Sequence, residues 1–273
     1  MKGLKPEDYL EPACIFCRPE DGTVTPVDLR RCLTRLDEHL GRNDYEAARR
    51  HLDYWKQEAQ AGNDWRGLLT IENERMGLLR KMGRRDEALA AVASALELID
   101  RAGLGDTVTA ATTWLNVGTV RKSFNEPDLA LPWYEKAREV YQRELAPTDG
   151  RLGGLYNNMA LVLTDLGRLD EARELYEAAL GIMERQEHGA LEMAITQLNL
   201  ANLAEARDGL LEAEAEIDRR LDRAWALLHR PELPRNGYYA FVCDKCASTF
   251  GYYGRFLDAQ ELKQTAEEIY ERA

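Results

Sequence analysis

The segment Gly83-Arg-Arg-Asp-Glu-Ala-Leu-Ala90 returns further along the chain as Gly167-Arg-Leu-Asp-Glu-Ala-Arg-Glu174, and looser copies begin at Gly209 and Gly254. Each copy is centred on an alanine. Alanines in this position recur at intervals of 40, 42, 42, 41 and 46 residues, as Ala48, Ala88, Ala130, Ala172, Ala213 and Ala259. A fixed period of this size is typical of stacked supersecondary units. The sequence therefore predicts a repeat array.

Each unit contains the pattern of two amphipathic helices. In the third unit the spacing predicts one helix over residues 111–124, a break at residues 123–127, and a second helix with Pro127 in its first turn. Small residues lie eight positions into four of the units, at Gly118, Ala160, Ala201 and Ala247. Two helices that cross closely need small side chains where their axes approach. We therefore expect an all-α fold, a right-handed α-solenoid of about six helix-turn-helix repeats.

The units are expected to begin near residues 29, 69, 111, 153, 194 and 240. Residues 1–28 then form an N-terminal extension that contains Pro6, Pro12, Pro19 and Pro26, and residues 29–273 form the superhelical domain. Some units depart from the pattern, with Arg35 and Arg75 at position seven and Arg220 at a position that is alanine in other units. Such departures are expected toward the ends of an array, where terminal repeats face water.

The full pattern resembles tetratricopeptide repeat proteins. It has an aromatic residue at position four (Trp114, Tyr156), Asn at six, a small residue at eight and Gly near fifteen. Alanine follows at twenty, then aromatic–alanine pairs, at Tyr134/Ala137 and Tyr176/Ala179. The period exceeds the basic repeat of about 34 residues. This longer form is similar to the repeats of kinesin light chains and of bacterial peptide-pheromone receptors.

The resemblance implies that first helices line a concave groove. The residues expected there include an asparagine and threonine group, Thr112, Asn116, Thr119, Asn157, Asn158, Asn199 and Asn202, with Arg80 and Lys122 as charge anchors. An asparagine amide can satisfy a peptide unit as both donor and acceptor. An asparagine ladder therefore favours an extended peptide read through its backbone. Alternatively, Asn at position six stabilises its own helix or a neighbouring one, and the groove binds its partner in another way or binds a folded partner.

Cysteine and histidine spacing offers a second type of site. Cys14 and Cys17 have the spacing of a zinc half-site and are weak metal candidates, with Cys32 and His39 as further ligands. The latter two lie seven residues apart on one helix, about 10 Å, which is too far for one tetrahedral ion. Cys243 and Cys246 fall on the inner face of a first helix, where thiols pack as core. We therefore expect no bound metal and no cofactor.

Composition narrows the function classes. The net charge is −12 without a basic run, which argues against nucleic acid. No apolar run reaches the roughly 20 residues of a membrane span, and the first residues do not form a signal peptide, so we expect a cytoplasmic protein. The glycines of residues 150–154 are interpreted as a linker before a helix, not as a phosphate loop. No catalytic set is evident.

The sequence thus predicts a non-enzymatic scaffold or adaptor that binds an extended peptide or protein tail in its groove. Two alternatives stay open. One is a structural protein that self-associates as a homodimer, and the other is a peptide-sensing regulator that acts through protein contacts. The resemblance identifies neither the partner nor the oligomeric state.

Overall fold

The structure is a computed structural model and describes residues 24–272. Within that range the chain forms twelve α-helices and no β-strand, so the predicted all-α class is confirmed. Two compact units divide the chain, unit 1 (Met1–Glu126) and unit 2 (Pro127–Ala273).

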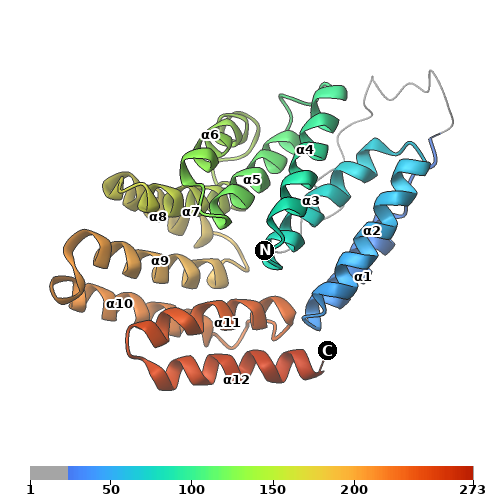
Figure 1. Cartoon of the computed structure of the whole chain (residues 1–273). Helices are drawn as coiled ribbons and strands as arrows, with labels where there is room; N and C mark the ends of the chain where they lie inside the picture. Colours follow the sequence, from blue (N-terminus) through green and yellow to red (C-terminus); the bar gives the residue numbers. More distant parts are fainter. Residues whose placement is uncertain (1–23, 273) are drawn as a thin grey trace. The chain divides into compact units, whose positions relative to one another are not determined.

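Unit 1 holds five helices. They are α1 (Leu29–Gly41), α2 (Tyr45–Ala61), α3 (Trp65–Lys81), α4 (Arg85–Arg101) and α5 (Val108–Ser123). Helices α1 and α2 form one antiparallel hairpin, α3 and α4 form the next, and α5 packs on α3 and α4 (Figure 1). The Asp64 side chain connects the segment before α1 to the start of α3. It accepts one hydrogen bond from the Val27 backbone and one from the Gly67 backbone, each at 2.9 Å.

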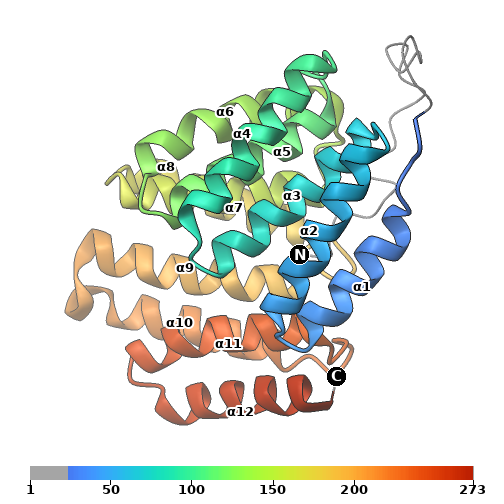
Figure 2. The same ribbon diagram turned by 45° about the vertical axis from the view of Figure 1, so that its right-hand side comes forward.

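Unit 2 holds seven helices. They are α6 (Pro127–Glu144), α7 (Gly150–Asp165), α8 (Leu169–Met183), α9 (Ala190–Asp208), α10 (Leu210–Leu228), α11 (Gly237–Tyr252) and α12 (Phe256–Arg272). The pairs α7–α8, α9–α10 and α11–α12 are antiparallel hairpins, and the last two lie side by side in both views (Figures 1 and 2). Pro127 begins α6, as its place in a first turn predicts.

The repeated alanines lie where two helices meet. All six of them are buried, and so are the small residues Gly118, Ala160, Ala201 and Ala247. A larger side chain at any of these positions would push helix axes apart. The burial of these residues agrees with the contact-distance explanation of the repeat, which stays a prediction.

A left-handed residue follows each of the helices α1, α3, α5, α7, α9 and α11. Glycine fills this position at Gly83, Gly167, Gly209 and Gly254, and asparagine fills it at Asn43 and Asn125, with φ of 57° and 61°. Only glycine, and asparagine to a lesser degree, adopts this conformation readily. The repeat thus uses one turn geometry with two residue types.

The interpretation of residues 150–154 as a linker is wrong. Gly150 begins α7, and the side chain of Asp149 caps the helix by accepting a hydrogen bond of 2.9 Å from the Arg151 backbone. Gly153 is a packing residue, because a Cβ atom at this position would lie 2.8 Å from the Cε atom of Met183 on α8. Gly153 therefore serves close helix contact inside the hairpin.

Candidate functional site

The asparagine and threonine group lies on the first helices of the hairpins. We call the polar positions of these helices the first-helix face: Arg80, Thr112, Asn116, Thr119 and Lys122 in unit 1, and Asn157, Asn158, Asn199 and Asn202 in unit 2. The two parts are described separately.

In unit 1 an asparagine pair joins α3 to α5. The Asn116 amide donates a hydrogen bond of 2.8 Å to the side-chain oxygen of Asn73. Asn73 is itself buried and donates to the Thr113 hydroxyl at 3.0 Å and to the Leu69 carbonyl at 2.9 Å. The amide group of Asn73 is thus fully used inside the protein, while the Asn116 oxygen is not used by these contacts.

Unit 2 repeats this arrangement between α7 and α9. The side-chain oxygen of Asn157 accepts hydrogen bonds from the Asn199 amide at 3.0 Å and from the Thr196 hydroxyl at 3.1 Å. The residues match those of unit 1 position by position, an asparagine on one first helix with a threonine and an asparagine on the next. Part of the asparagine pattern therefore stabilises neighbouring helices.

Asn158 and Asn202 differ from these pairs. Asn158 is half-buried on α7, and within residues 24–272 its side chain makes no hydrogen bond. The position that would carry its partner on the preceding first helix holds Leu115. Asn202 is exposed on α9 and accepts a hydrogen bond of 3.0 Å from the Tyr253 hydroxyl. Asn158 is thus the asparagine of the first-helix face whose side chain makes no hydrogen bond within the described residues.

The threonines and cations of the face have local structural roles. The Thr112 and Thr119 hydroxyls donate to backbone carbonyls of their own helix, at 3.0 Å and 2.9 Å. Arg80 lies in the last turn of α3 and Lys122 in the last turn of α5. Cations at these places interact favourably with the helix dipole.

Glu74 occupies the same repeat position as Asn116, Asn158 and Asn199. Burial and the nearby charge of Asp37 raise the pKa of Glu74, Lys81 opposes them, and the resulting pKa is about 7. Burial also raises the pKa of Asp37. Unit 1 therefore carries a carboxyl group that titrates near neutral pH where other repeats have an amide.

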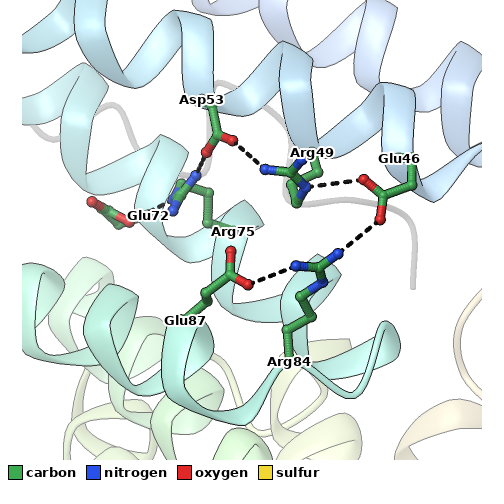
Figure 3. Close-up of polar contacts among 7 residues, drawn as sticks. All are labelled: Glu46, Arg49, Asp53, Glu72, Arg75, Arg84 and Glu87. Carbon is green, nitrogen blue, oxygen red and sulfur yellow. Dashed lines mark hydrogen bonds and ion pairs between the residues drawn. The ribbon is translucent and has the colours of Figure 1, made fainter.

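A charged network joins the first two hairpins, and the sequence pattern did not predict it (Figure 3). The fully buried Glu72 carboxylate pairs with Lys56, at 2.7 Å, and with Arg75, at 3.1 Å. Arg75 also pairs with Asp53 on α2. The network continues on α2, where Arg49 pairs with Asp53 and with Glu46. Arg84 then links Glu46 to Glu87 on α4. Arg75 departs from the repeat pattern because it neutralises buried carboxylates between hairpins.

Arg220 has a similar explanation in unit 2. It stands where other units have alanine and is only 8% exposed. Its guanidinium donates to Gln197 at 3.2 Å and pairs with Glu216 and Glu177, at 3.1 Å and 3.4 Å. The ion pair with Glu216 could have been predicted from the sequence, because the two opposite charges lie four residues apart on one helix.

The thiols of the described range are core residues. Cys243 and Cys246 are buried and unoxidised inside the hydrophobic core of α9–α12, as predicted, and burial raises the pKa of Cys243 to about 11. Cys14 and Cys17 lie outside the described residues. No group of three potential metal ligands gathers within residues 24–272, and no helix there has the length and apolarity to cross a membrane.

Comparison with known proteins agrees with this geometry. The sequence profile of the tetratricopeptide repeat matches residues 68–143 and 151–224, more than half of the chain. No curated protein sequence matches at a significant level.

Solved structures share the fold at low identity. BtubC (BKLC) from P. vanneervenii is 23% identical, with a TM-score of 0.62 over 76% of this chain and 83% of that one. A Rap protein complexed with competence and sporulation factor is 13% identical, with a TM-score of 0.61 over 91% and 66% of the two chains. Kinesin light chain repeats from Podosopora anserina are 15% identical, with a TM-score of 0.51 over 75% of this chain and 95% of that one.

Hairpins with a buried alanine, a left-handed turn residue and polar first helices define a helical-repeat scaffold for proteins or peptides. The chain belongs to the tetratricopeptide repeat family. The predicted likeness to kinesin light chain and Rap-type repeats is confirmed at the level of the fold.

Proposed function

We propose that the first-helix face binds an extended peptide or protein tail, and that the chain is a cytoplasmic adaptor without catalytic activity of its own. The observation that carries this proposal is the Asn158 amide, half-buried on the face and without a partner inside residues 24–272. A buried amide gains from a ligand that supplies both a donor and an acceptor, as a peptide backbone does. The Rap structure holds a bound factor, but at 13% identity it supports the fold alone.

In unit 2 the Asn199 oxygen adds an acceptor on the first helix that follows the one carrying Asn158. Asn199 uses its NH₂ group toward Asn157 on α7, which fixes the side chain before a ligand arrives. A fixed acceptor loses little entropy on binding. The structural and ligand-binding explanations of the asparagines are therefore compatible, one served by the nitrogen and the other by the oxygen.

The test begins with peptides selected from a random-peptide phage library on the immobilised full chain, followed by calorimetry on purified variants. Asn158→Ala is expected to weaken a selected peptide by roughly 5- to 10-fold, equivalent to about 1 kcal/mol or slightly more. Its melting temperature should be unchanged, because the amide makes no internal hydrogen bond.

Asn157→Ala is the matched control. It removes the acceptor of Thr196 and Asn199, and we expect it to lower the free energy of unfolding by about 1–3 kcal/mol. If Asn158→Ala left every selected peptide unaffected, or if no peptide could be selected, peptide recognition by this face would be disproved.

A further inference from the structure

A second surface, separate from the first-helix face, lies on the α1–α2 hairpin. It is a hollow of about 830 Å³ in unit 1. We call it the end hollow, and its lining consists of Asp28, Arg30, Arg31, Thr34, Arg35, Glu38, His51, Tyr54 and Trp55.

The end hollow occupies the side of a first helix that other repeats bury. Positions three, seven and ten of the first helix are Arg31, Arg35 and Glu38 in the first repeat, and all three are exposed. The same positions of the third, fourth and fifth repeats are buried, at Thr113, Val117, Val120, Leu155, Met159, Val162, Thr196, Leu200 and Leu203. Among the helices of unit 1, α2 is the one that packs closely on α1. The end hollow thus lies where other repeats pack against a neighbouring helix, but its side chains are charged.

The floor of the end hollow is aromatic and well fixed. The Trp55 ring meets Tyr54 edge-on, with 5.6 Å between ring centroids, and His51 in a similar way at 6.2 Å. His51 donates a hydrogen bond of 2.9 Å to the Cys32 carbonyl on α1. Tyr54 is nevertheless 54% exposed. Side chains held by neighbours lose little freedom when a partner covers them.

The wall on α1 supplies uncompensated positive charge. Arg35 pairs with Glu38, whereas the Arg30 and Arg31 side chains make no hydrogen bond or ion pair within residues 24–272. Asp28 uses its carboxylate to cap α1 through the Arg31 backbone. Two arginines without partners thus line the same hollow as the exposed Tyr54 ring, in a chain whose net charge is −12.

We propose that the end hollow binds an acidic segment of a partner protein that carries an apolar anchor side chain. Carboxylates of the segment pair with the Arg30 and Arg31 guanidinium groups, which match carboxylate geometry. The anchor covers Tyr54 and Trp55. Trp, Tyr and Arg are the residue types that most often dominate interface energetics.

The phage selection on the full chain also tests this proposal. We expect a class of selected peptides with at least two acidic residues beside Trp, Phe or Leu. Arg30→Ala combined with Arg31→Ala should weaken that class about tenfold or more, and raised salt should weaken it further. Tyr54→Ala should weaken the same class, and Asn158→Ala should leave it unchanged.

Arg219→Ala on α10 is the control, because it removes an exposed arginine elsewhere. Equal loss of binding in this control, or selected acidic peptides insensitive to the double variant, would overturn the proposal. Self-association of the wild-type chain that disappears in the double variant would assign the hollow to a second copy instead. Tighter peptide binding after neutralisation of Glu7, Asp8 and Glu11 in the full chain would assign it to the chain's own N-terminal residues. Peptides whose binding is weakened by Asn158→Ala but not by the double arginine variant would support the first-helix face and not the end hollow. Each proposal can therefore be disproved without the other.

Discussion

Asn125 performs in the turn after α5 the task that glycine performs after α3, α7, α9 and α11. Its φ of 61° lies in the left-handed region, between α5 and α6. Asn125→Val should lower the free energy of unfolding by about 1–2 kcal/mol, because a branched side chain clashes with its own backbone there. Urea unfolding measures the effect. Asn125→Gly is the control and should remain within about 0.5 kcal/mol of the wild type; equal losses in both variants would contradict a conformational cause.

Glu74 makes stability depend on pH near neutrality. Its pKa rises from 4.5 to about 7 on folding, so between these values the folded chain holds a proton that the unfolded chain releases. The free energy of unfolding therefore contains the full contribution of Glu74 below pH 4.5, and this contribution declines as the pH rises from 4.5 through about 7. Glu74→Gln keeps the neutral form at every pH. It should be more stable than the wild type by about 1–3 kcal/mol at pH 8.

The difference between wild type and Glu74→Gln is the quantity to measure, by urea unfolding across the pH range. Other carboxyl groups titrate in both proteins and cancel. These include Glu46, Glu126 and Asp149, whose pKa values their arginine partners lower. A difference that is constant with pH would show that Glu74 is ionised throughout.

Single residues were predictable where the repeat gives them an equivalent in another unit. The buried alanines and the glycine turns are such residues. The roles of the asparagines required coordinates, because Asn157 and Asn158 are adjacent in sequence and only the first has a partner on α9. Partner choice depends on side-chain distances across helices, which a period does not encode.

At the scale of helices, the joint between α2 and α3 replaces an apolar contact by charge. Arg75→Leu removes one cation from the buried Glu72 and leaves that carboxylate only Lys56, so we expect a loss of about 3–5 kcal/mol. The double variant Glu72→Leu/Arg75→Leu should recover most of this loss, since a matched apolar pair often equals a buried ion pair.

Thermal and urea unfolding of the two single variants and the double variant form a complete cycle. Asp53 keeps Arg49 as a partner in every variant, so its charge is not stranded. A double variant no more stable than either single variant would mean that the network is required for the joint itself.

Helix existence followed from the apolar spacing, and Pro127 marked the beginning of α6, whereas the beginning of α7 was not predicted. Helix α7 begins at Gly150, and its glycines indicated a linker. The deciding features are the Asp149 cap and the tight contact of Gly153 with Met183. Helix propensity ranks glycine low, and tertiary packing overrides that ranking here.

At the scale of the whole chain, hairpins contact mainly their sequence neighbours, and the described residues divide into two compact units. Stability in such an array is approximately a sum of local terms. Leu52→Ala on α2 and Leu221→Ala on α10 each empty a fully buried site, the first in unit 1 and the second in unit 2. Each should cost about 2–5 kcal/mol.

Native-state hydrogen exchange of the full chain distinguishes local from global consequences. Leu52→Ala should accelerate exchange in α1–α4 and leave the peptides of α9–α12 at wild-type rates, and Leu221→Ala should do the reverse. Local openings expose only the amides of the hairpins that separate, so a core defect is felt where the contacts are lost. Equal acceleration across all described helices by either variant would instead mean one cooperative transition, and a peptide bound to one unit would then stabilise both.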